Sequence, residues 1–94
     1  MSKVYLAADF GGGSGRVIAG WLEDGKLTME EIHRFGNRQV RLGDHVYWDF
    51  PALFEDMKAG LKKAASKGYE VESIGVDTWG VDFVLLDGED RLVG

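Results

Sequence analysis

A run of small residues near the N-terminus constrains the fold of this chain more than any other feature. Residues 11–15 contain four glycines and Ser14, and they separate two short apolar segments at 4–10 and 16–22. Short apolar runs bounded by turn residues are typical of buried strands. The glycine-rich run is therefore expected to turn the chain between two antiparallel strands, at the tip of a hairpin.

Composition excludes several classes of protein. The 14 glycines are about twice average usage, but they are not periodic and proline occurs once, which excludes collagen and argues against a disordered linker. The lack of cysteine excludes disulfide scaffolds, cysteine-ligated zinc and thiol chemistry, and it fits a cytoplasmic location. A net charge of -5 argues against nucleic-acid binding. No apolar run approaches ~18 residues and no signal peptide precedes the first strand, so neither membrane insertion nor secretion is expected.

Hydrophobic periodicity and turn residues predict the remaining elements. Apolar residues recur at helical spacing from Leu53 to Ala65, Pro51 suits the first turn of that helix, and Gly68 suits its end. The full stripe of expected core residues on this helix is Leu53, Phe54, Met57, Leu61, Ala64 and Ala65. The other expected elements are a strand at 27–35, a long loop with a short hairpin at 36–48, a helix at 51–67, and strands at 74–79 and 81–86.

This element order predicts the fold class. Three sequential antiparallel strands, a crossover helix and a strand parallel to the first begin an α/β domain of the ribonuclease-H-like or actin-like ATPase fold, with a mixed sheet. Completing such a domain requires more chain. We therefore expect residues 1–94 to be the N-terminal part of its first domain, a fragment without an internal boundary.

The glycine-rich turn is a candidate phosphate site. It is not a P-loop, because Arg16 stands where the motif needs lysine and a strand follows instead of a helix. A glycine-rich turn can still present several backbone N–H groups to a phosphate, and Ser14 and Arg16 would add a hydroxyl and a positive charge. Asp9, at the end of the first strand, would then be placed to hold Mg²⁺. The alternative, given equal weight, is a tight hairpin that needs glycine only to turn.

A second candidate site follows the strand at 74–79. If that strand pairs parallel to the first, Asp77 lies beside Asp9 and two carboxylates meet at one end of the sheet, which suggests a metal site. Trp79 and Gly80 would form a wall and a point of close approach for a small ligand, and Asp82 would accept hydrogen bonds from its hydroxyls. The alternative is a plain strand and turn, with Trp79 packed and Asp82 solvated.

Other polar residues carry weaker predictions. His33 and His45 lack the paired spacing of metal ligands. The arginines Arg34, Arg38 and Arg41 could bind an anion, although a solvated loop is the default.

A metal-dependent nuclease is a rival interpretation. It would use Asp9, Glu55 and Asp77 as a ribonuclease-H-like acidic cluster. The glycine-rich turn and the acidic composition argue against it, and Glu55 is expected to face solvent.

Several motifs resemble a known family. Residues 9–16 resemble the first phosphate motif of the FGGY carbohydrate kinases, in the sugar kinase, Hsp70 and actin superfamily. Residues 31–35, 47–49 and above all 73–87 resemble the rhamnulokinases of that family. The resemblance runs along essentially all 94 residues.

The resemblance implies a kinase that transfers the γ-phosphoryl group of Mg-ATP to the 1-hydroxyl of L-rhamnulose in rhamnose catabolism. A fuculose or xylulose kinase is the alternative within the family, and a superfamily member that binds ligands without turnover is the non-enzymatic one. The residues that match family positions are Gly12, Gly13, Ser14, Gly15 and Arg16 for ATP, Asp9 for Mg²⁺, and Gly80 for the sugar, with Trp79 and Asp82 beside it. The family usually carries alanine or hydroxylic residues where Gly12 and Gly13 stand.

The resemblance also predicts what this fragment lacks. In the family, the catalytic aspartate lies later in the chain than residue 94, so no catalytic residue is assigned here and the fragment alone is expected to be inactive. An incomplete sheet exposes strand edges and apolar surface, so we also expect the isolated fragment to self-associate.

Overall fold

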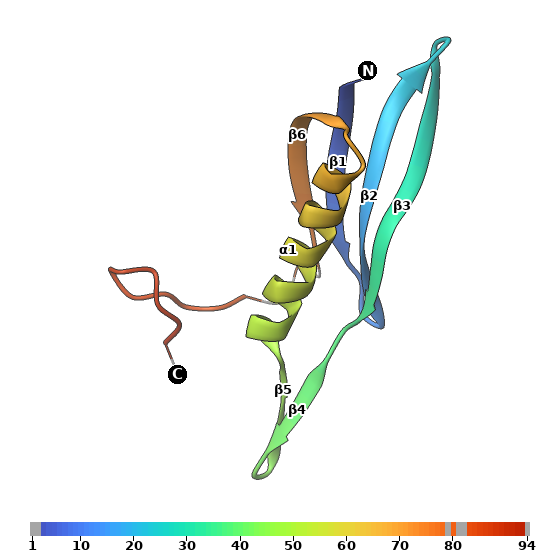
Figure 1. Cartoon of the computed structure of the whole chain (residues 1–94). Helices are drawn as coiled ribbons and strands as arrows, with labels where there is room; N and C mark the ends of the chain where they lie inside the picture. The colour runs from blue at the N-terminus through green and yellow to red at the C-terminus, as the bar shows by residue number, and fades with distance from the viewer. Residues whose placement is uncertain (1–2, 79, 81–82, 94) are drawn as a thin grey trace.

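A computed structural model of the chain describes residues 3–78, 80 and 83–93. It is an α/β structure with a mixed sheet and one helix (Figure 1). The elements are β1 (Lys3–Phe10), β2 (Ser14–Glu23), β3 (Lys26–Gly36), β4 (Gln39–Leu42), β5 (His45–Trp48), α1 (Phe50–Ser66) and β6 (Glu70–Asp77). No helix among the described residues is long and apolar enough to cross a membrane.

The main sheet has the strand order β3-β2-β1-β6. The first three strands form an antiparallel meander, and the turn between β2 and β3 places Asp24 and Gly25 at φ values of 53° and 77°. Such positive φ values at both central residues suit a two-residue hairpin turn. Because α1 crosses over the sheet, β6 returns parallel to β1, as the sequence predicts.

Local signals fix both ends of α1. The Asp49 side chain accepts a hydrogen bond from the Ala52 N–H at 3.2 Å, and Pro51 occupies the first turn. Gly68 follows the last turn with a φ of 77°, which only glycine adopts without strain. In its middle, α1 passes so close to β2 that a Cβ atom on Gly60 would lie 2.5 Å from the Val17 side chain.

The hydrophobic core lies between α1 and one face of the sheet. Alternate residues of β1 and β2 are buried there, together with Ile32 and Ala64; the buried set is Val4, Leu6, Ala8, Val17, Ala19, Ile32 and Ala64. α1 covers this face over β2 and β3. On β6, Ile74 and Val76 are paired with Leu6 and Ala8, yet they stay 47% and 62% exposed. The helix therefore leaves the β6 side of the sheet uncovered.

Three sequence predictions need correction. The strand expected at 81–86 is not found in its described part, residues 83–86, where Leu86 forms only an isolated bridge with Leu92. Among the described residues this segment pairs only with the chain that follows it, where the Val93 N–H donates to the Leu85 carbonyl at 3.0 Å. Phe54 and Ala65 are exposed and not core residues, because α1 lies over β2 and β3 and turns these side chains away from them. The expected strand at 74–79 spans Glu70–Asp77 instead.

The segment between β3 and α1 is more ordered than a long loop. It contains the predicted short hairpin, formed by β4 and β5, which projects from the end of β3 (Figure 1).

Candidate functional site

Two carboxylates meet at one end of the sheet. Asp9 and Asp77 are direct partners in the parallel β1–β6 ladder, which confirms the predicted pairing. Side chains alternate between the two faces of a strand, and the helix-side face carries Leu6 and Ala8. Asp9 and Asp77 consequently share the face opposite α1.

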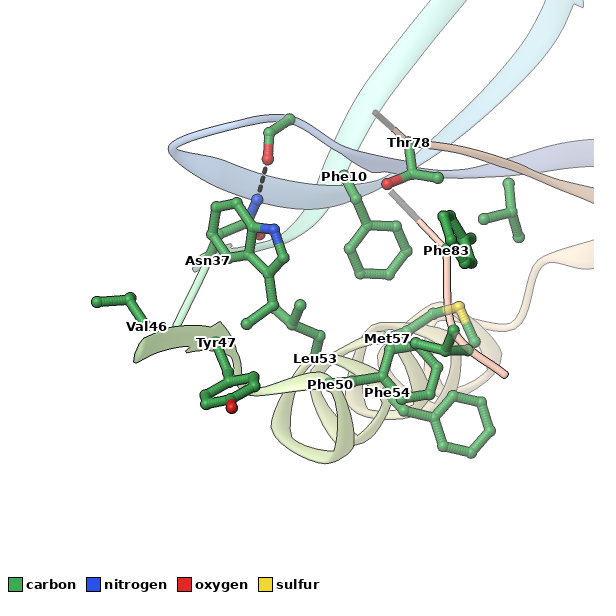
Figure 2. Close-up of a pocket in the computed structure, with 14 residues that line it drawn as sticks. Phe10, Asn37, Val46, Tyr47, Phe50, Leu53, Phe54, Met57, Thr78 and Phe83 are labelled. Carbon is green, nitrogen blue, oxygen red and sulfur yellow. Dashed lines mark hydrogen bonds between the residues drawn. The ribbon is translucent and has the colours of Figure 1, made fainter. Parts of the chain in front are cut away.

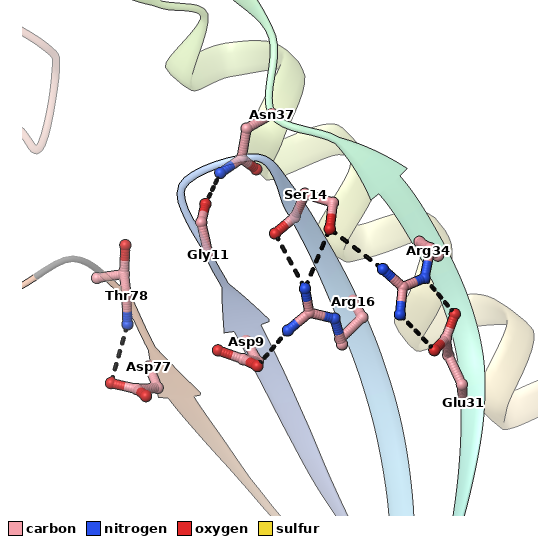
Figure 3. Close-up of polar contacts among 9 residues, drawn as sticks. All are labelled: Asp9, Gly11, Ser14, Arg16, Glu31, Arg34, Asn37, Asp77 and Thr78. Atoms are coloured by element: carbon pink, nitrogen blue, oxygen red, sulfur yellow. Dashed lines mark hydrogen bonds and ion pairs between the residues drawn. The ribbon is translucent and has the colours of Figure 1, made fainter.

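The glycine-rich turn joins β1 to β2, as predicted, and Asn37 fastens it from the end of β3 (Figure 3). The Asn37 backbone N–H donates to the Gly13 carbonyl at 3.3 Å, and the Asn37 Nδ2 donates to the Gly11 carbonyl. No described peptide bond is cis, so the N–H groups of Gly12 and Ser14 point opposite to these two carbonyls. Both N–H groups therefore face away from Asn37.

Arg16 lies beside Asp9 on the open face of the sheet. Its Nη1 donates to the Asp9 Oδ2 at 2.5 Å, and its Nη2 donates to the Ser14 Oγ at 3.0 Å (Figure 3). The Asp77 Oδ1 accepts the N–H of Thr78 at 3.0 Å. The face thus presents one carboxylate, Asp9, that is paired to an arginine, and one, Asp77, whose contact among the described residues is the neighbouring Thr78 N–H.

This donor set fits Mg²⁺ held jointly with a polyphosphate. Mg²⁺ binds through one or two carboxylates, keeps several waters and takes phosphate oxygens as further ligands. Asp9 and Asp77 supply two carboxylates on one face. The described residues contain no group of three or more metal-ligating side chains. Two carboxylates suit a metal ion that is also bound by phosphate oxygens better than a metal ion whose ligands all come from the protein.

The third acid of the nuclease interpretation is engaged elsewhere. Glu55 is exposed on α1, and its carboxylate pairs with Lys58 at 2.7 Å. This hydrogen bond and the charge of Lys58 lower the pKa of Glu55. Glu55 joins no metal-binding group with Asp9 and Asp77 in the described part of the chain.

Packing requires glycine at one position of the turn and not at another. A Cβ atom on Gly15 would lie 2.4 Å from the Phe35 ring, which packs edge-on against Phe10 with centroids 5.6 Å apart. Gly15 is buried on the helix side, so packing explains this glycine. A Cβ atom on Gly13 would meet nothing within 4 Å. Gly12 and Gly13 are both exposed and leave the tip of the turn open.

The predicted sugar residues are only partly described. Gly80 lies in an exposed turn, and a Cβ atom there would meet nothing within 4 Å. No contact within the described chain therefore requires glycine at this position. Trp79 and Asp82 lie outside the described residues.

An apolar pocket that the sequence did not predict lies on the helix side of the same sheet end (Figure 2). It has a volume of about 670 Å³, and its lining is rich in aromatic side chains from β1, β5, α1 and the segment after β6. Phe10 and Thr78 belong to its lining, so the pocket extends to the ends of β1 and β6. The only sequence signal was the density of aromatic residues at 47–54. The sheet end therefore has a charged face and an apolar face.

Known proteins resemble nearly the whole chain, although no protein-family model matches it. The rhamnulokinase of Oceanobacillus iheyensis is 48% identical over 90 residues, which cover 96% of this chain and 19% of that protein. The rhamnulokinase of Bacteroides thetaiotaomicron is 46% identical over 93 residues, 99% of this chain and 19% of that protein. The chain matches an N-terminal fragment of the rhamnulokinases. It spans about a fifth of the length of these relatives.

The rhamnulokinase match bears on the choice between interpretations. The rhamnulokinase of Bacillus subtilis is 46% identical over 95% of the chain, so the match does not depend on one short motif. These relatives are kinases by name. The nuclease interpretation gains no such support.

Proposed function

We propose that this chain is the N-terminal part of a kinase that uses ATP to phosphorylate L-rhamnulose to L-rhamnulose 1-phosphate in rhamnose catabolism. The observation that carries the proposal is the 48% identity to a rhamnulokinase over 96% of the chain. The shared face of Asp9, Asp77 and the glycine-rich turn supports it independently. A cytoplasmic location belongs to the same proposal and rests on the family resemblance and the lack of cysteine.

The fold is part of the proposal. The order of an antiparallel β1–β2–β3 meander, the crossover helix α1 and the parallel strand β6 supports a ribonuclease-H-like or actin-like ATPase domain. In open α/β sheets, ligands bind beyond the carboxyl ends of parallel strands. Asp9 and Asp77 lie at those ends of β1 and β6.

We assign the phosphates of ATP to the tip of the glycine-rich turn. Gly12 and Gly13 leave room for close approach, and the N–H groups of Gly12 and Ser14 supply backbone donors. Arg16 adds charge-assisted hydrogen bonds and is held at the turn by Asp9. Gly15 supports this geometry through its packing on Phe35.

Mg²⁺ would be held by Asp9 and Asp77, and when bound it neutralises charge on the transferred phosphoryl group. Gly80, with Trp79 and Asp82, is proposed to contact the sugar. Phosphoryl transfer depends on positioning both reactants, and no general base is assigned within these residues. The chain alone is therefore expected to show no turnover.

A coupled assay of ADP release tests the proposal on the complete protein that contains this sequence. With Mg-ATP, L-rhamnulose should be phosphorylated with a higher kcat/KM than L-fuculose or D-xylulose, and the product should carry phosphate on the 1-hydroxyl. Asp9→Asn should reduce kcat by about 100-fold or more, because a charged ligand to the metal is lost. Asp44→Asn, in the turn between β4 and β5, is the matched control and should leave kcat unchanged.

Three results would change the proposal. Preference for another ketose would replace the substrate and keep the reaction. Binding of ATP and sugar without turnover would favour the non-enzymatic member of the superfamily. Cleavage of a nucleic acid by the protein, abolished by Asp9→Asn, would favour the nuclease.

A further inference from the structure

A bulge in β3 brings two charged residues to the open face of the sheet. Residues three apart on a regular strand point to opposite faces. The β2–β3 register shifts between Val17 and Ile18, and the extra residue lies between Glu31 and Arg34. As a result, these two side chains pair directly: the Arg34 Nε donates to the Glu31 Oε1 at 2.8 Å and the Nη2 to the Oε2 at 2.9 Å.

The paired Arg34 reaches the glycine-rich turn. Its Nη1 donates to the Ser14 Oγ at 3.2 Å, and the Arg16 Nη2 donates to the same oxygen at 3.0 Å (Figure 3). A hydroxyl oxygen has two lone pairs and one proton. Both lone pairs of Ser14 are therefore taken by guanidinium groups. Its O–H remains as a donor, and no hydrogen bond among the described residues uses it.

The arrangement places two positive charges side by side. Arg16 and Arg34 are direct cross-strand partners, and like charges in such positions repel each other. Each guanidinium is held by one carboxylate, Asp9 or Glu31, on its outer side. The hydrogen bonds from Arg34 lower the pKa of Glu31, and the charge of Arg16 contributes to the same shift. The two cations converge on Ser14, where the free O–H also lies.

We propose that Arg34 is a second arginine of the phosphate site, positioned by Glu31, and that it binds the polyphosphate of ATP together with Arg16 and the Ser14 hydroxyl. The inference rests on the proposed function. An anion at Ser14 would relieve the repulsion between the guanidinium groups and accept the remaining O–H. A guanidinium also has five N–H donors, so Arg34 retains hydrogen-bonding capacity beyond Glu31 and Ser14.

Two measurements on the complete protein test the role of Arg34. Arg34→Ala should raise KM for ATP by about 10-fold or more, the effect of losing a charge-assisted hydrogen bond, with KM for the ketose unchanged. It should weaken binding of inorganic tripolyphosphate, measured by calorimetry, by a similar factor. Arg34→Lys should recover part of both losses, because it keeps the charge and loses the planar fork.

Glu31→Gln tests the positioning step, and it should raise KM for ATP less than Arg34→Ala does. Arg38→Ala is the matched control, since Arg38 is an exposed arginine of similar accessibility whose partner is Asp56 at 3.6 Å. Its KM for ATP should stay within about 2-fold of the parent value. Thermal unfolding of each variant separates loss of binding from loss of folding. If Arg34→Ala does not fold, Arg34→Lys and Glu31→Gln take its place in the two binding measurements.

The inference is overturned if Arg34→Ala behaves like Arg38→Ala in both measurements, or if it raises KM for the ketose alone. Its failure is distinct from failure of the proposed function. Arg34-dependent tripolyphosphate binding in a protein that phosphorylates no ketose would support the inference and reject the function. Turnover of L-rhamnulose that is indifferent to Arg34 would do the reverse.

Discussion

The two faces at the end of the sheet are built in different ways. On the charged face, Asp9, Arg16, Ser14, Arg34 and Glu31 form a continuous series of contacts within β1, β2 and β3. On the apolar face, large side chains stay exposed on β6 and along the segment that follows it, among them Ile74, Val76, Phe83 and Leu85. The charged face is thus organised by neighbours within a meander, whereas the apolar face has more hydrophobic surface than these 94 residues cover.

The largest expected effect concerns the apolar face. We predict that the isolated chain self-associates, because Phe83 and Val76 are 82% and 62% exposed and β6 is an edge strand. Light scattering over a concentration series measures this. Phe83→Asp should shift the chain toward monomer, whereas Leu22→Lys, at a site near the end of β2 that is 70% exposed, should do so less. A monomer at all concentrations would show that the exposed apolar surface has no such consequence.

The second prediction separates the two kinds of glycine in the turn. Gly15→Ala should lower the free energy of unfolding by about 1–3 kcal/mol, because the new methyl group overlaps the Phe35 ring. Gly13→Ala should leave it unchanged or raise it by up to about 1 kcal/mol, because the site is open and an alanine restricts the unfolded chain. Urea denaturation measures both. Equal effects of the two substitutions would contradict a packing role specific to Gly15.

The third prediction concerns the attachment of the turn to β3. Asn37→Asp keeps the shape of the side chain but removes the donor to the Gly11 carbonyl, so it should destabilise the chain by about 1–2 kcal/mol. Asn37 is the only asparagine in the sequence, so the control is Asp44→Asn, which makes the reverse change of charge in the turn between β4 and β5. Unchanged stability of Asn37→Asp would mean that the turn holds its shape without this contact.

The smallest effect is a pH dependence. Hydrogen bonds from Arg34 lower the pKa of Glu31, whereas backbone N–H groups of Arg91 and Glu89 lower that of Asp87. A carboxyl whose folded pKa lies below its unfolded value stabilises the fold above the unfolded pKa, about 4 for both types, and loses that contribution as pH falls through the folded value. Carboxyl NMR titration should show that Arg34→Ala raises the pKa of Glu31 and leaves that of Asp87 unchanged. An unmoved Glu31 would contradict the pairing.

The sequence predicts the charged face better than its surroundings, for physical reasons. The strands, the capped helix and the pairing of Asp9 with Asp77 follow from periodicity, turn residues and crossover topology, which are local or nearly local signals. The overlap of Gly15 with Phe35 and the contact of Arg34 with Ser14 join residues 20 positions apart through a register and a bulge that no local pattern encodes. The strand expected at 81–86 had apolar residues but needed a pairing partner, which local propensity does not reveal.

The central claim is that the glycine-rich turn and the two carboxylates hold Mg-ATP. A crystal structure of the complete protein with Mg²⁺ and a non-hydrolysable ATP analogue tests it most directly. The account predicts polyphosphate oxygens within hydrogen-bond distance of the Gly12 and Ser14 N–H groups and of both Arg16 and Arg34, with Mg²⁺ beside Asp9 and Asp77. A nucleotide whose phosphates lie away from residues 11–16 would contradict it.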